Sequence, residues 1–291
     1  MKKRKPKLIV IVGATASGKS RYALRLARKV KGEIVSFDAM QLYKGFPVLT
    51  NQSAREDQKR IPHHLVGVLP LSKEFSAAAY AQEAEKAIEA ILRRGKVPIL
   101  VGGSGFYLKA LLEGKHAPVK AKCRIRKKYM RLFSEKGGAY LYEKLRAIDP
   151  ERAKTIHPND TYRIIRALEI FEVTGRKPSE FARGGGLKDT YEIEMKGLRW
   201  DRKVLYERIN RRVEKMIRDG AVEEARKCLR KNLSPTAKKI IGLEELMAYL
   251  KGKSSLEEAV AKIQQATRNY AKRQETWFRK EQGIRWLRGY S

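Results

Sequence analysis

A glycine-rich stretch near the N-terminus has the residue types and spacing of a phosphate-binding loop. Residues 13–20 read GATASGKS and fit the pattern G-x-x-x-x-G-K-[ST]. In this pattern the backbone N–H groups surround phosphate oxygens, the lysine contacts them, and the last hydroxyl binds Mg²⁺. We therefore expect Lys19 to bind phosphate and Ser20 to be a metal ligand. The pattern does not identify the phosphate compound.

The segments on either side of this loop predict that it lies between a strand and a helix. Residues 8–12 (LIVIV) are apolar and largely β-branched, which is typical of a buried parallel strand. Residues 21–32 (RYALRLARKVKG) have the periodicity of an amphipathic helix that ends at Gly32. Since the N-terminus of a helix attracts anions, this context supports a phosphate site.

Two further polar residues follow predicted strands. Asp38 ends the segment 33–38 (EIVSFD), and Ser104 follows residues 97–101 (VPILV) within a Gly-Gly-Ser-Gly turn. Because the carboxyl ends of parallel strands meet at one edge of a sheet, we expect both residues to lie beside the phosphate loop. Asp38 could hold Mg²⁺ in a nucleotide kinase or hydrolase, or act as a general base. The amide of Gln41 suits a flat, hydrogen-bonding group such as a nucleobase.

The alternation of strands and helices predicts an α/β fold with a parallel sheet at its core. We expect this core to comprise residues 1–113 and 190–291, and a basic helical insertion to comprise residues 114–189. Lys and Arg outnumber Asp and Glu over residues 120–166, and no apolar strand interrupts them. The segment 191–198 alternates like a strand that returns to the sheet. Further helices are expected at residues 76–94, 201–219, 221–231, 235–250 and 255–281.

The charge of the chain is its strongest compositional feature. It has 65 Lys and Arg against 32 Asp and Glu, a formal net charge of +33. Such a chain favours a polyanionic partner, and nucleic acid fits better than an anionic membrane because the charge is spread over predicted helices. A highly charged solvated surface without a polyanionic partner is the alternative.

The remaining composition excludes several classes of protein. No apolar run approaches the ~20 residues that span a bilayer, and the basic N-terminus lacks the cleavage site of a secretory signal. Cys123 and Cys228 are far apart and without paired spacing, which argues against a zinc site and a disulfide. Unpaired thiols fit the reducing cytoplasm, where we expect the protein to reside.

Seven segments, in order along the chain, resemble the tRNA dimethylallyltransferase family. They are GATASGKS, SFDAMQLYKG, IPHHLVGV, VGGSGFYLKALLEG, HPNDTYRIIRALEIFEVTG, LYERINRRVEKM and TRNYAKRQETWFR. The resemblance implies a P-loop NTPase-like sheet with a small helical insertion domain. It also implies transfer of a dimethylallyl group from its diphosphate to N6 of the adenosine 3′-adjacent to the tRNA anticodon, adenosine-37. The implied cofactor is Mg²⁺, with Ser20 as its ligand.

The resemblance assigns roles to the residues of the predicted site. Asp38 is the implied general base, and Lys19 and Ser104 are further catalytic residues, with Ser104 standing where the family usually has threonine. The diphosphate would be bound by the whole loop: Gly13, Ala14, Thr15, Ala16, Ser17, Gly18, Lys19 and Ser20.

The resemblance also implies a tRNA surface, with the anticodon stem-loop held by the insertion and by the C-terminal helices. Leu243 and Glu244 depart from the aromatic and basic residues that the family commonly has, whereas Lys239 keeps a positive charge. The implied partners are tRNA and dimethylallyl diphosphate, with no membrane, and the chain is expected to act as a monomer. The implied tRNA-binding residues are Asp38, Ala39, Met40, Gln41, Ser104, Arg126, Tyr162, Arg163, Ile164, Ile165, Arg166, Lys239, Arg268, Lys272 and Arg273.

Two other functions are compatible with the same motifs. A P-loop kinase of a nucleotide or small molecule would use Asp38 to hold Mg²⁺ and would consume ATP. A non-catalytic RNA-binding protein could retain the loop as part of its fold, and would then not depend on Asp38.

Overall fold

The computed structural model describes residues 5–114, 123–181 and 185–289. The chain divides into two compact units, one formed by Met1–Leu112 with Leu187–Ser291 and the other by Glu113–Gly186. Residues 115–122 and 182–184, which belong to the predicted insertion, lie outside the described residues.

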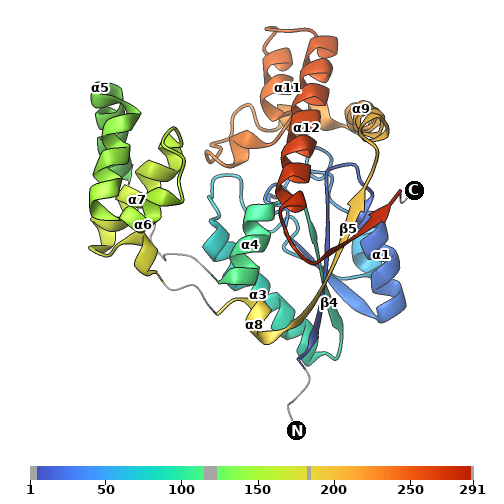
Figure 1. Cartoon of the computed structure of the whole chain (residues 1–291). Helices are drawn as coiled ribbons and strands as arrows, with labels where there is room; N and C mark the ends of the chain where they lie inside the picture. Colours follow the sequence, from blue (N-terminus) through green and yellow to red (C-terminus); the bar gives the residue numbers. More distant parts are fainter. Residues whose placement is uncertain (1–4, 115–122, 182–184, 290–291) are drawn as a thin grey trace. The chain divides into compact units, whose positions relative to one another are not determined.

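The first unit is built on a six-stranded sheet whose paired strands are all parallel, in the order β3-β2-β4-β1-β5-β6 (Figure 1). The predicted α/β fold with a parallel core sheet is therefore confirmed. The edge strand β6, which pairs with β5, was not predicted from the sequence. The strands are β1 Lys7–Gly13, β2 Gly32–Ser36, β3 His63–His64, β4 Val97–Gly102, β5 Glu192–Arg199 and β6 Ile284–Arg288.

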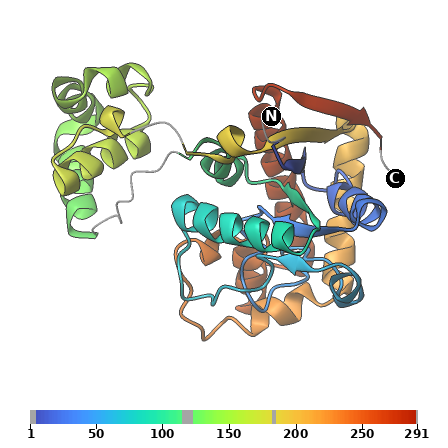
Figure 2. The same ribbon diagram turned by 90° about the horizontal axis from the view of Figure 1, so that it is seen from below.

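Helices cover both faces of this sheet, which explains the uninterrupted apolar run of β1. Leu8 and Val10 point to the face covered by α3 (Ala77–Arg93) and α4 (Gly105–Glu113). Ile9 and Ile11 point to the opposite face, which α1 (Lys19–Val30) covers. Figure 2 shows α1 and α3 on opposite sides of the sheet. A strand buried on both faces cannot alternate with polar residues.

The C-terminal helices pack against the segment that follows β2. Tyr43, Phe46 and Leu49 share a buried cluster with apolar residues of these helices. This packing fixes the loop that precedes the short helix α2 (Arg55–Arg60). The loop consists mainly of turns. The remaining helices of this unit are α2 Arg55–Arg60, α8 Leu187–Thr190, α9 Arg202–Arg218, α10 Ala221–Arg226, α11 Leu243–Leu250 and α12 Leu256–Arg279.

Two helix predictions in this region were wrong at their boundaries. The predicted helix 221–231 ends at Arg226, where α10 gives way to turns. The predicted helix 235–250 is a 3₁₀ turn, Ala237–Lys239, followed by α11. Gly242 separates them with a φ of 96°, a left-handed conformation that glycine adopts without steric cost.

The second unit is helical, with its own core. It contains α5 (Cys123–Ile148), α6 (Pro150–Lys154) and α7 (Thr161–Thr174), besides a 3₁₀ turn at Pro178–Glu180. Ile164 and Ile165 of α7 are buried in this core. Their predicted contact with tRNA therefore cannot come from their side chains.

None of the helices in residues 5–114, 123–181 and 185–289 combines the length and the apolar character that crossing a bilayer requires.

Candidate active site

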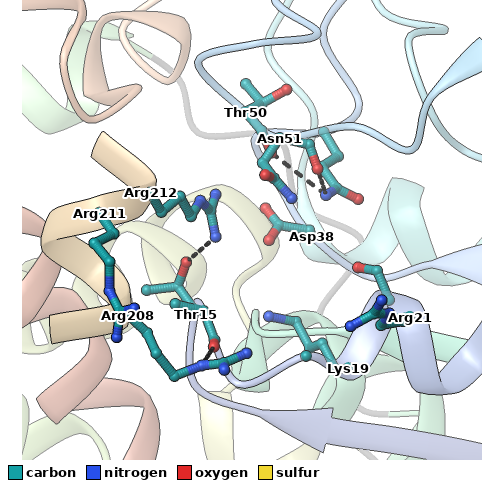
Figure 3. A pocket seen from close by; sticks show the side chains of 13 residues that line it. Thr15, Lys19, Arg21, Asp38, Thr50, Asn51, Arg208, Arg211 and Arg212 are labelled. Carbon is teal, nitrogen blue, oxygen red and sulfur yellow. Dashed lines mark hydrogen bonds between the residues drawn. The ribbon is translucent and has the colours of Figure 1, made fainter. Parts of the chain in front are cut away.

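A cavity of about 490 Å³ lies where the phosphate loop follows β1 and where Asp38 follows β2 (Figure 3). Side chains from the loop, from the segment after β2 and from α9 line it, so the three elements enclose one space. Its lining residues are Thr15, Ala16, Gly18, Lys19, Ser20, Arg21, Asp38, Gln41, Thr50, Asn51, Arg208, Arg211 and Arg212.

The phosphate loop has the compact form that its glycines allow. A Cβ on Gly13 would lie 2.7 Å from Ser17 Oγ, and Gly18, at the start of α1, has a φ of 90°. The Lys19 ammonium donates a 3.3 Å hydrogen bond to the Ala14 carbonyl, which folds the lysine over the loop. The first turn of α1 carries no acidic residue, so nothing there opposes an anion at the helix N-terminus.

Arginines of α9 form the opposite wall of the cavity, and sequence reasoning did not identify them. Arg212 Nη1 donates to Thr15 Oγ1 at 2.7 Å, and Arg208 Nε donates to the Ala16 carbonyl at 3.0 Å. The Arg208 guanidinium also lies 4.4 Å from the ring centroid of Trp200. The available signal was the i, i+4 spacing of Arg208 and Arg212 on a predicted helix, which places both on one face.

The cavity carries an excess of positive charge. Burial lowers the pKa of Lys19 from 10.5 to about 8; the Asp38 carboxylate raises this pKa, and Arg212 lowers it further. Burial also lowers the pKa of Arg212. Among the described residues that line the cavity, Asp38 is the single carboxylate. This charge distribution suits a polyanionic ligand such as a diphosphate.

Asp38 is held in place by the turn that it begins. Its Oδ1 accepts a 3.0 Å hydrogen bond from the Met40 N–H, and its own N–H donates to Ser36 Oγ at 3.3 Å. Figure 3 shows the Asp38 carboxylate directed into the cavity, between Arg212 and Lys19.

Gln41 and Ser104 brace this turn from either side. Gln41 accepts from Ser36 Oγ at 2.9 Å, and its Nε2 donates to the Asn51 carbonyl at 2.8 Å. Ser104 Oγ accepts a 3.0 Å hydrogen bond from the Ala39 N–H. The structure thus places Gln41 in the cavity wall. Ser104 contacts Ala39, the residue after the predicted base Asp38, but does not itself line the cavity.

His63 is a further residue that sequence reasoning did not place in the site. It borders a smaller cavity of about 20 Å³ together with Lys19, Ser20 and Asp38. His63 Nδ1 is 2.7 Å from the Ile61 carbonyl, whereas the buried Nε2 has no hydrogen-bond partner among the described residues. Burial lowers the pKa of His63, so the neutral ring presents Nε2 as an acceptor.

The residues present fit a magnesium ion bound through the ligand. Ser20 and Asp38 border both cavities and offer hard oxygen donors, which Mg²⁺ prefers. Within the described residues, no group of three or more His, Cys, Asp or Glu could form a metal site by itself. A magnesium ion at this place would therefore complete its shell with phosphate oxygens and water.

Several of the predicted tRNA-binding residues outside the cavity lie in the first unit, on α12 and in the 3₁₀ turn Ala237–Lys239. On α12, Lys272 and Arg273 are exposed, and Arg268 Nη1 donates to Asn210 Oδ1 at 2.7 Å; Lys239 is exposed in its 3₁₀ turn.

In the second unit one of the predicted residues, Arg126, lies against an exposed aromatic ring. Tyr162 is 64 % exposed, and the Arg126 guanidinium lies 4.9 Å from its ring centroid. Arg163 pairs with Asp160 at 2.6 Å. Arg166 pairs at 3.3 Å with Glu169, which is fully buried. The helical unit therefore presents an exposed aromatic ring beside the Arg126 guanidinium.

Known proteins are similar in sequence to this chain along nearly its whole length. The IPP transferase family model matches residues 41–281. The tRNA dimethylallyltransferase of Thermoanaerobacter sp. (strain X514) is 44 % identical over 286 residues, covering 96 % of this chain and 91 % of that protein. The corresponding protein of Carboxydothermus hydrogenoformans is 41 % identical over 289 residues, covering 97 % and 91 %.

Solved structures agree with these sequence relatives. The tRNA isopentenylpyrophosphate transferase of Bacillus halodurans superposes with a TM-score of 0.70 at 37 % identity, covering 98 % of this chain and 90 % of that one. A eukaryotic dimethylallyltransferase acting on tRNA has a TM-score of 0.82 at 31 % identity, covering 97 % and 74 %. Together with the phosphate loop, Asp38 and the arginine wall, these matches show that the chain belongs to the IPP transferase family, the tRNA dimethylallyltransferases, with a P-loop NTPase-like fold.

Proposed function

We propose that this protein transfers a dimethylallyl group from dimethylallyl diphosphate to N6 of adenosine-37, the adenosine 3′-adjacent to the tRNA anticodon. The product is N6-(dimethylallyl)adenosine. The observation that carries the proposal is the cavity in which Asp38, the single carboxylate among the described lining residues, lies between Lys19 and Arg212. The cations Lys19 and Arg212 suit a leaving diphosphate, and the Asp38 carboxylate suits the removal of a proton.

The cationic wall would stabilise the leaving group. As the bond between the allylic carbon and the diphosphate oxygen breaks, its electron pair goes to the diphosphate. Lys19 and Arg212 line the cavity and are held against the loop, so they would stabilise the developing charge with little reorganisation. Ser20 would hold the magnesium ion, which supplies further neutralisation of the diphosphate charge when it is bound.

Asp38 would accept the proton of the acceptor. The lone pair of the adenine N6 is delocalised into the ring, so N6 is a poor nucleophile until it loses a proton. As the N6–carbon bond forms, a proton passes from N6 to the Asp38 carboxylate, and general-base assistance of this kind is worth about 10²–10⁴-fold. The turn that holds Asp38 Oδ1 keeps the carboxylate in one orientation.

Basic residues of both units would hold the tRNA. Adenosine-37 lies in the anticodon loop, where a base can leave the stack and enter a pocket. The ring of Tyr162, backed by Arg126, suits stacking on an unpaired base, and Arg163, Lys239 and Lys272 suit phosphate contacts.

A mass measurement tests the proposal directly. The protein is incubated with an anticodon stem-loop, dimethylallyl diphosphate and Mg²⁺, and the RNA fragments are analysed by mass spectrometry. We expect the adenosine-37 fragment to gain one C₅H₈ unit without ATP. Unchanged RNA together with consumption of added ATP would overturn the proposal in favour of a kinase.

We further propose that the protein acts in the cytoplasm and as a monomer. Buried Cys228 is a free thiol, which suits a reducing compartment. Light scattering of the purified protein tests the oligomeric state, and a mass twice that of the chain would contradict it.

A further inference from the structure

A buried amide on α12 contacts two separate parts of the site. Gln274 is 3 % exposed. Its Oε1 accepts a 2.7 Å hydrogen bond from the Thr15 N–H of the phosphate loop, and its Nε2 donates a 3.0 Å hydrogen bond to the Gly103 carbonyl after β4. One side chain therefore joins the loop after β1 to the turn after β4.

The turn after β4 is shaped for the approach of α12. A Cβ on Gly103 would lie 2.0 Å from Gln274 Nε2, and a Cβ on Gly105 would lie 2.2 Å from the Trp277 ring. Real Cβ atoms do not approach other atoms so closely, so a side chain at either position would displace Gln274 or Trp277. The glycines of this turn thus admit a helix, and the contact of Gln274 depends on them.

Tyr270 extends the contact of α12 to the segment that carries the base. It lies one helical turn before Gln274, and the Ser104 and Gln274 side chains beside its hydroxyl lower its pKa. Burial and the nearby Asp38 charge raise the pKa of its hydroxyl, which therefore stays protonated. Ser104 Oγ in turn accepts from the Ala39 N–H, the residue after Asp38. Since Ser104 follows Gly103, the contacts of Gln274 reach from Thr15 through these two residues to the turn of Asp38.

We propose that Gln274 is a positioning residue that sets the phosphate loop at a fixed distance from the Asp38 turn. The inference rests on the proposed function, in which the loop holds the leaving diphosphate and Asp38 serves the acceptor. An amide is suited to this place because Thr15 offers a donor and Gly103 an acceptor. A carboxylate would lack the donor, and an apolar side chain would leave both backbone groups unpaired.

The alternative is that Gln274 only satisfies two buried backbone groups. Its replacement would then lower the stability of the protein, but activity would be normal wherever the protein is folded. A positioning role predicts a loss of activity in the folded protein, because a misplacement of about 1 Å can reduce a rate about 10²-fold.

The test compares Gln274→Met, which has a similar volume, with Gln264→Met on the same helix. Below the melting temperature of both variants, we expect Gln274→Met to lose about 10²-fold in kcat and about tenfold in affinity for pyrophosphate with Mg²⁺. Affinity for an anticodon stem-loop should stay within about twofold. Equal kcat and pyrophosphate affinity in the two variants would overturn the inference.

Hydrogen exchange separates this inference from the proposed function. We expect the amides of residues 13–20 and 102–105 to exchange faster in Gln274→Met than in Gln264→Met. Unchanged exchange would overturn the inference whether or not the wild-type protein modifies RNA. Absence of RNA modification together with faster exchange would overturn only the proposed function.

A double variant covers the case in which Gln274→Met does not fold. Gly103→Ala alone would collide with Gln274, whereas Gly103→Ala with Gln274→Ala removes the overlap. We expect the double variant to melt at the temperature of Gln274→Ala and to keep its low kcat. Recovery of kcat in the double variant would show that packing alone matters, and would overturn the inference.

Discussion

Arg212 Nη1 donates a 2.7 Å hydrogen bond to the hydroxyl of Thr15, a residue of the phosphate loop that precedes it by 197 positions. This contact joins α9 to the loop and brings a second cation opposite Lys19. The cavity therefore has two cationic sides, which a phosphate loop by itself does not provide.

Arg212→Ala should reduce kcat by about 10²–10³-fold, because a preoriented donor to the leaving diphosphate is lost. Arg212→Lys should recover part of the rate, since it keeps the charge but not the planar pair of donors. Arg218→Ala, an exposed arginine of the same helix, is the control. Steady-state kinetics with saturating tRNA measures the effect; equal rates for Arg212→Ala and Arg218→Ala would contradict it.

Asp38→Asn should lower kcat by about 10²–10⁴-fold while the affinity for an anticodon stem-loop changes little. The amide keeps the shape of the carboxylate and can still accept from the Met40 N–H, but it cannot take the proton of N6. Asp219→Asn, at the exposed end of α9, controls for the charge change. Normal product formation by Asp38→Asn would favour a role for this residue other than general base.

The affinity for pyrophosphate should fall as pH rises through about 8. The pKa of Lys19 is about 8 without ligand, and the anion binds the protonated ammonium, so above this pH binding must first add a proton. The affinity should fall by at most tenfold per pH unit. Lys19→Arg stays charged and corrects for the titration of pyrophosphate itself. Calorimetry between pH 7 and 9.5 should show the ratio of wild-type to Lys19→Arg affinity declining; a constant ratio would argue against a lowered pKa.

Arg163→Ala and Arg166→Ala should affect RNA binding similarly but differ in their effect on stability. Each removes one cation, so the slope of log Kd against log salt should decrease by about one. Arg163 pairs with partly buried Asp160, whereas Arg166 pairs with fully buried Glu169. Arg166→Ala should therefore also cost roughly 3 kcal/mol of unfolding free energy, because a buried charge loses its closest partner.

Salt-dependent binding and thermal unfolding check this pair of variants. Lys188→Ala, which lies in the first unit, gives a reference for the removal of one positive charge elsewhere. An unchanged salt slope in both variants would remove the second unit from the proposed RNA surface.

The sequence by itself determined those parts of the site that are local. The apolar run of β1, the loop pattern and the amphipathic α1 are adjacent in the chain, so their order already predicts a phosphate site. Asp38 and Ser104 follow strands directly, and parallel strands bring such residues to one edge. These inferences needed only the period of each segment and the general geometry of parallel sheets.

The tertiary structure alone decided which distant residues complete the site. Arg212 and Gln274 lie on amphipathic helices whose sequences do not show what they face, and their hydrogen bonds to Thr15 span 197 and 259 residues. The edge strand β6 and the break at Gly242 were missed for a related reason. Packing against distant segments selects these conformations, and local propensity does not record it.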